Sequence, residues 1–169
     1  MIYIQKKEQF LEKILTNRLL QLSLFYTLLF LIPFVLKGPQ LLLGSLINFL
    51  FIIGVSQFKL KEITPALLLP SIATYSYGLL FGGATVFLTY LIPFIFISNL
   101  IYILVFKNIK REYINIFLAS LVKAIFLFLC TYILFKTIGL PKTFLISMGM
   151  IQFFTAIIGG GIASRIAKL

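Results

Sequence analysis

Six apolar runs, each of about 20 residues, constrain this chain more than any other feature of its sequence, because roughly 20 helical residues cross a bilayer core. The breaks between the runs contain glycine, proline or charged residues, which are the usual punctuation between helices. We therefore predict an all-α integral membrane protein that forms a six-transmembrane-helix bundle. The predicted helices are residues 17–36, 40–58, 63–81, 84–106, 112–135 and 143–165. Pro70 and Pro93 are predicted to interrupt the third and the fourth of them.

The composition agrees with a membrane protein of a single domain. Of the 169 residues, 61% are hydrophobic and 11% are charged, whereas soluble domains have about 45–50% apolar and about 25% charged residues. A chain of this length is expected to form one bundle, so residues 17–169 are predicted to be a single transmembrane domain. Residues 1–16 would be a cytoplasmic basic segment, either a tail that sets the topology or an amphipathic helix at the membrane surface.

The basic residues between the runs predict the orientation of the bundle. With the N-terminus inside, eleven of the 15 lysines and arginines lie in inside segments and three, Lys37, Lys136 and Lys142, lie in outside segments. Cytoplasmic loops of membrane proteins carry such an excess of basic residues. Both termini are therefore predicted to be cytoplasmic. The net charge of +11 then faces anionic lipid, and it requires no nucleic acid as a partner.

Missing residue types exclude most enzyme classes. The chain has no histidine and no aspartate, and its four glutamates, Glu8, Glu12, Glu62 and Glu112, each lie beside lysine or arginine in a polar segment. Metal sites and proton relays inside a membrane need acids or histidines at depth. No phosphate-binding loop or nucleophile elbow is present either. We expect no enzyme activity, no metal and no cofactor.

Lys123 is the one charged residue inside an apolar run, FLASLVKAIFLFLC at 117–130. It lies eleven residues after Glu112 and thirteen before Lys136, so it is roughly 16–20 Å from either end of its helix. A lysine side chain is too short to reach water over that distance, and we expect Lys123 to point into the bundle. Placing lysine there costs about 2.5–3.5 kcal/mol, and no acid in an apolar run can pair with it. Lys123 is then neutral, is solvated by amides and water, or has a counter-ion from outside the chain. We predict the last, with Lys123 binding a substrate that carries a carboxylate, a phosphate or another acceptor.

Three amide side chains lie at comparable depth in other predicted helices. Asn48 and Gln152 are near the middle of the second and sixth helices, and Asn99 is in the inner half of the fourth. We predict that Asn48 and Gln152 complete a polar wall around the substrate, and we include Asn99 in the site. Each amide is equally consistent with a hydrogen bond between helices, worth about 0.6 kcal/mol.

Small residues recur every four positions in the sixth predicted helix, at Ala156, Gly160 and Ser164 and again at Gly159, Ala163 and Ala167. Such stripes let helices approach closely. The stripe is consistent either with packing inside the chain or with docking to a partner membrane protein.

Four stretches, GPQLLLGSLINFLFIIGVSQF, ALLLPSIATYSYGLLFG, LIPFIFISNLIYILVF and ASLVKAIFLFLCTYIL, together resemble a prokaryotic family over residues 37–165. The family is the substrate-binding S components of energy-coupling factor (ECF) transporters. The most similar branch has no assigned substrate and carries G-x-L-x-N, P-x-x-x-x-x-N and a lysine in the fifth helix. Gly44–Asn48, Pro93–Asn99 and Lys123 match these motifs, so the resemblance adds Gly44 to the candidate site.

The resemblance implies a multi-pass protein of a prokaryotic cell membrane with six helices and cytoplasmic termini. S components capture a vitamin-like micronutrient from outside and dock to a transmembrane coupling protein driven by two ATPase subunits. Many present A-x-x-x-A in the first helix, where this chain has only Ser23 and Thr27 at that spacing. These two residues and the stripe of Ala156, Gly160 and Ser164 are the candidates for docking.

Two other functions remain open from the sequence. One is a structural or assembly subunit of a larger membrane complex, in which Lys123 would be a hydrogen-bond donor between helices. The other is a small channel or flippase, in which the polar residues would line a pore.

Overall fold

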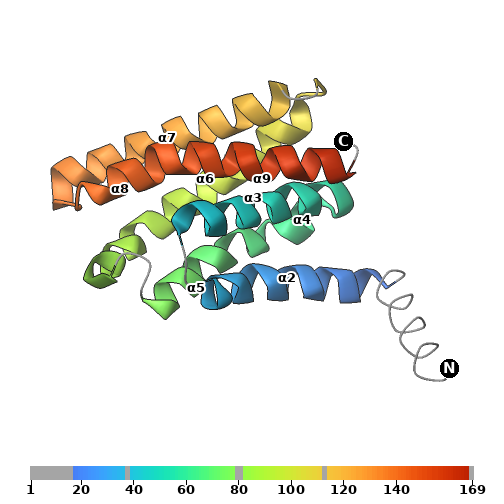
Figure 1. Ribbon diagram of the computed structural model, residues 1–169, viewed down its shortest axis with the longest axis horizontal. Helices are drawn as coiled ribbons and strands as arrows, with labels where there is room; N and C mark the ends of the chain where they lie inside the picture. The colour runs from blue at the N-terminus through green and yellow to red at the C-terminus, as the bar shows by residue number, and fades with distance from the viewer. Residues whose placement is uncertain (1–16, 37–38, 79–81, 112–113, 168–169) are drawn as a thin grey trace.

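The computed structural model describes residues 17–36, 39–78, 82–111 and 114–167, and Figure 1 shows that they form a bundle of helices. No strand occurs among these residues, which confirms the prediction of an all-α fold. The predicted N-terminal segment, residues 1–16, lies outside the described residues, as does Lys37.

Five helical segments are long and apolar enough to cross a membrane. They are Arg18–Val35, Gln40–Gln57, Gly82–Asn108, Ile114–Ile138 and Thr143–Ala167. The first, second and fourth are α2 (Arg18–Val35), α3 (Gln40–Gln57) and α7 (Ile114–Ile138). The third joins the 3-10 helix η2 (Gly82–Phe87) to α6 (Leu88–Asn108), and the fifth joins α8 (Thr143–Ile146) and the π-helix η3 (Ser147–Ile151) to α9 (Gln152–Ala167). These five segments match the first, second, fourth, fifth and sixth predicted helices.

The third predicted helix, 63–81, is not a single α-helix. Its place is taken by α4 (Leu60–Ile63), the 3-10 helix η1 (Pro65–Leu68) and α5 (Leu69–Tyr77). Pro65 and Pro70 explain the interruption, because proline lacks the N–H for the helical ladder and collides with the preceding turn. Gly78 ends α5 in the left-handed conformation with φ of 73°, which glycine adopts without strain.

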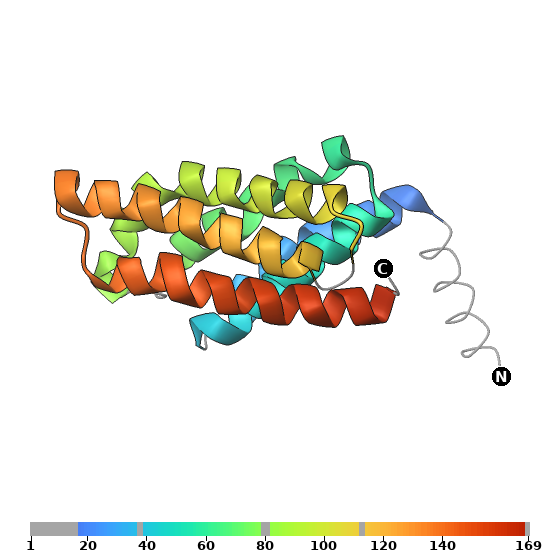
Figure 2. The same ribbon diagram turned by 90° about the horizontal axis from the view of Figure 1, so that it is seen from above.

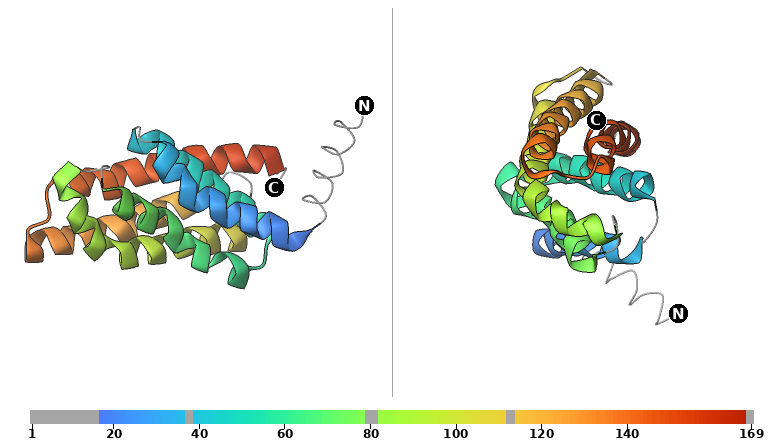
Figure 3. Two further views of the ribbon diagram at one scale, coloured as in Figure 1. Left: turned by 90° about the horizontal axis from the view of Figure 1, so that it is seen from below. Right: turned by 90° about the vertical axis from the view of Figure 1, so that its left-hand side faces the viewer.

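The helices form layers, with α3 between two groups of helices. Figure 1 and the end-on view in Figure 3 place α2 and α5 on one side of α3, and α7 and α9 on the other. Figure 2 shows α7 and α9 lying lengthwise beside each other. Many apolar side chains on the outer faces, such as Val35, Ile133 and Ile166, are exposed, as expected for helices surrounded by lipid.

Glycine sets the close contact between α3 and α9. A Cβ atom added at Gly159 would collide with the backbone oxygen of Ser45 and would lie 2.7 Å from the backbone nitrogen of Phe49. Only a residue without a side chain fits there, so the two backbones pack directly against each other. This contact determines where the side chains of α3 and α9 meet.

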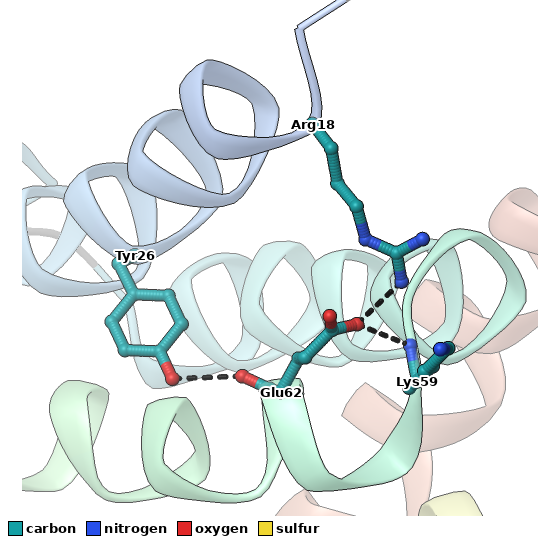
Figure 4. A network of polar contacts seen from close by, with 4 residues as sticks. All are labelled: Arg18, Tyr26, Lys59 and Glu62. Atoms are coloured by element: carbon teal, nitrogen blue, oxygen red, sulfur yellow. Dashed lines mark hydrogen bonds and ion pairs between the residues drawn. The ribbon is translucent and has the colours of Figure 1, made fainter.

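Polar contacts fasten the start of α2 to α4 at one end of the bundle (Figure 4). The guanidinium of Arg18 bonds to the Glu62 carboxylate at 2.6 Å, and the same oxygen accepts the backbone N–H of Lys59 at 2.8 Å. The Tyr26 hydroxyl donates to the backbone oxygen of Glu62 at 2.8 Å. The hydrogen bond from Arg18, and then that from Lys59, lower the pKa of the Glu62 carboxyl below its ordinary value.

Candidate functional site

Lys123 lies on α7 and points into the bundle, as predicted. Its side chain is 1% exposed. The ammonium nitrogen donates a hydrogen bond of 2.6 Å to Oδ1 of Asn48 on α3. It also lies 5.0 Å from the centre of the Tyr102 ring on α6, a distance at which the ring face attracts a cation. Three helices therefore meet at this ammonium group.

Asn48 connects Lys123 to α9. It is 2% exposed, and its Nδ2 donates to the backbone oxygen of Gly44 at 2.8 Å and to Oγ1 of Thr155 at 3.2 Å. With Nδ2 bonded to these two oxygens, Oδ1 is directed toward Lys123. A Cβ atom added at Gly44 would lie 2.8 Å from Cγ2 of Thr155. Gly44 thus permits the close packing that brings Asn48 to Thr155.

A cavity of about 80 Å³ adjoins Lys123. All five residues predicted to bind substrate line it: Lys123, Asn48, Gln152, Asn99 and Gly44. They come from α3, α6, α7 and α9, and α5 adds Pro70, Ser71 and Thr74. The structure thus brings the five predicted residues together, and their role in binding stays a prediction.

Asn99 and Gln152 differ in how their amides are used. Asn99 is 4% exposed, and its Nδ2 donates to the backbone oxygen of Leu67 at 3.4 Å. This bond joins α6 to η1, and it therefore favours the interpretation of Asn99 as a contact between helices. Gln152 is half-buried, and its side chain makes no hydrogen bond within the described part of the chain. Its amide is available to a molecule in the cavity.

The cavity extends toward the end of the bundle where α3 begins and α5 ends. Gln40 and Thr74 line it there, and Met148 of the π-helix η3 lines it as well. The Ser147 hydroxyl in η3 donates to Oε1 of Gln40 at 2.8 Å. Single π-helical turns are often found at functional sites. In the predicted orientation this end of the bundle faces outward.

No carboxylate of the described residues lies at the site. Glu62 is the single acid within the described ranges, and it is paired with Arg18 beyond the other end of α3. An ammonium group has three donors, and Lys123 bonds only to Asn48 among the described residues. The cavity therefore contains a buried lysine amine with unused donors and, among the described residues, no acid beside it.

Several residues of the site were not predicted. Tyr102 is fully buried under Lys123, and its hydroxyl donates to the backbone oxygen of Ala156 at 2.8 Å. Thr155, Ser71 and Thr74 were missed because hydroxyl residues are common in membrane helices, where their own helix often satisfies them. Thr74 does bond to the backbone oxygen of Pro70. One signal for Thr155 was available. It follows Gln152 by three residues, and this spacing makes the two residues neighbours on one face of α9.

The two groups predicted to dock a partner lie in different surroundings. Ala156, Gly160 and Ser164 are buried, and a Cβ atom at Gly160 would collide with the Tyr102 hydroxyl. In this structure the stripe packs inside the chain, which is the other interpretation given above, so it presents no surface to a partner. Ser23 and Thr27 are exposed on α2.

The fold and the cavity define an α-helical chain with several helices able to cross a membrane and a polar site buried between them. No protein-family model, no curated protein and no solved structure matches this chain.

Proposed function

We propose that this chain is the substrate-capture subunit of an ECF-type uptake transporter in a prokaryotic cell membrane. It would bind a vitamin-like small molecule from outside and then dock to a transmembrane coupling protein and its ATPase subunits. The observation that carries the proposal is the cavity beside Lys123. Five predicted positions on four helices line one cavity, and the amine of Lys123 has no acid partner among the described residues.

The proposal includes six membrane crossings with both termini in the cytoplasm. The interrupted segment from Ile63 through η1 and α5 supplies the sixth crossing. Of the two prolines that interrupt it, Pro70 is buried among other parts of the protein, whereas Pro65 is exposed close to the predicted cytoplasmic end. Broken helices are tolerated in membranes at such places.

Substrate would bind in the half of the bundle that faces outward. Ligand pockets have volumes of about 300–1,000 Å³, whereas the cavity has about 80 Å³. Binding a vitamin-like molecule would therefore require η3 to move away from α3, with loss of the bond between Ser147 and Gln40. Docking would use the exposed side of α2 with Ser23 and Thr27.

The first experiment is purification from the native membrane followed by mass spectrometry of co-purifying small molecules and proteins. We expect one enriched small molecule at near-stoichiometric amount, together with a membrane coupling protein and ATPases. A chain purified without any small molecule, and without these partners, would contradict the proposal.

A structural subunit of a larger membrane complex is the second candidate. The bond between Lys123 and Asn48 favours it, because it joins α7 directly to α3. If this were the whole role, Lys123→Met would disrupt assembly of the complex, and the isolated chain would bind no small molecule.

A further inference from the structure

We infer that the cavity takes an organic anion, with its carboxylate-like group on Lys123 and its apolar body against the apolar side chains that line the same cavity. This inference rests on the proposed function, because it names the chemical class of substrate for the same cavity.

The first reason is the charge of the site. Burying an ammonium group without an anion is costly, because water no longer solvates it. The amide oxygen of Asn48 supplies only a dipole at 2.6 Å, and the ring of Tyr102 supplies only its face at 5.0 Å. The single acid among the described residues, Glu62, is occupied by Arg18. A ligand with a negative charge would complete the pairing that these residues leave open.

The second reason is the number of free donors. Lys123 has three N–H groups and bonds one to Asn48 among the described residues. Two remain, and the side chain of Gln152 adds two more at the same cavity. The Nδ2 of Asn48 is used on Gly44 and Thr155. The site therefore offers four free donors, beside the amide oxygen of Gln152, and such donors suit the two oxygens of a carboxylate.

The third reason is the apolar wall. The cavity is also lined by Leu43, Ile47, Leu88, Ile95 and Met148. An inorganic anion would leave these side chains against water, whereas a hydrocarbon or aromatic body would cover them. The volume of about 80 Å³ must increase to hold such a body, and the flexible side chain of Met148 is suited to adapt to its shape.

The test compares carboxylates with their uncharged amides on the full chain in lipid nanodiscs. The probes are acetate and acetamide, butyrate and butyramide, benzoate and benzamide, and inorganic phosphate. We expect at least one carboxylate to raise the midpoint temperature of unfolding. The same carboxylate should bind at least ten-fold more tightly than its amide and at least ten-fold more tightly than phosphate. The inference is overturned if amides or phosphate bind as tightly as the best carboxylate, or if no carboxylate binds.

Two variants and a control assign the preference to the site. Lys123→Met should remove the ten-fold preference for the carboxylate. Lys136→Met, the same substitution at an exposed position of α7, should keep it. If Lys123→Met does not fold, Gln152→Ala should weaken the best carboxylate at least three-fold, because it removes donors from a half-buried position. A preference that survives these substitutions would contradict the inference.

The result separates this inference from the proposed function. If the co-purifying molecule is uncharged, the inference that the ligand is an anion is overturned, while the proposed function of capturing a small molecule stands. If no small molecule co-purifies and none of the probes binds, both fail.

Discussion

The ammonium nitrogen of Lys123 and Oδ1 of Asn48 are 2.6 Å apart, and their hydrogen bond joins α7 to α3 inside the bundle. Asn48 continues the connection to Thr155 on α9 at 3.2 Å. One amide thus links three helices next to a cavity. Its loss would leave a buried cation without its acceptor and would loosen α3 from α9.

Asn48→Leu is expected to destabilise the protein by about 1–3 kcal/mol, the cost of leaving a buried polar group without its partner. Asn99→Leu is the matched control, because Asn99 is buried at the same cavity but makes only a bond of 3.4 Å. Thermal or denaturant unfolding in nanodiscs would measure both. If the free energy of unfolding falls equally in the two variants, the bond from Lys123 to Asn48 does not contribute to stability.

Gly159→Ala is expected to destabilise the protein by about 1–3 kcal/mol, the usual cost of overpacking. The added methyl group would run into the backbone of α3 at Ser45 and Phe49, and backbone cannot move aside as a side chain can. Gly161→Ala provides the control, since its Cβ atom would meet no atom within 4 Å. An unfolding midpoint that is unchanged in Gly159→Ala would contradict the direct contact of α3 with α9.

Acid is expected to weaken the attachment of α2 to α4. The pKa of Glu62 is lowered by the hydrogen bonds from Arg18 and Lys59. A carboxyl group whose pKa is lower in the folded state stabilises the fold above its unfolded value, about 4.3, and this stabilisation is lost as the pH falls through the folded value. Because the pair is partly exposed, the effect will be modest. As the pH falls from 7 to 3, the unfolding midpoint should decrease more in the wild type than in Glu62→Gln. An equal decrease in the two proteins would show that ionisation of Glu62 does not stabilise the fold.

The predicted orientation can be measured by cysteine labelling. With Cys130 replaced by alanine, single cysteines at positions 37, 59, 107 and 142 would be treated in intact cells with a reagent that does not cross membranes. Positions 37 and 142 should react and positions 59 and 107 should not, because basic residues concentrate on the cytoplasmic side. The reverse pattern would place the cavity in the inner half of the bundle and would contradict capture from outside.

The sequence predicted the fold and the site unequally, for physical reasons. Depth in a membrane helix follows from the distance to its charged ends, so Lys123, Asn48 and Gln152 were expected at one level, and they line one cavity. Rotation about the helix axis has no such marker, and Tyr102 was missed for that reason. The stripe at Gly160 required small residues without revealing which neighbour covers them. The third helix was predicted as one span interrupted at Pro70, and its division into α4, η1 and α5 with a further break at Pro65 was not predicted.

The affinity of Lys123→Met for the co-purifying molecule tests the central claim most directly. Methionine keeps the length of the side chain and removes the donor and the charge. Titration calorimetry in nanodiscs should show binding weakened by more than about 1.5 kcal/mol, the lower range for a hydrogen bond to a charged group, while Lys136→Met binds as the wild type does. Affinity in Lys123→Met equal to that of the wild type would contradict the account, because the buried lysine would then hold the helices together without binding the substrate.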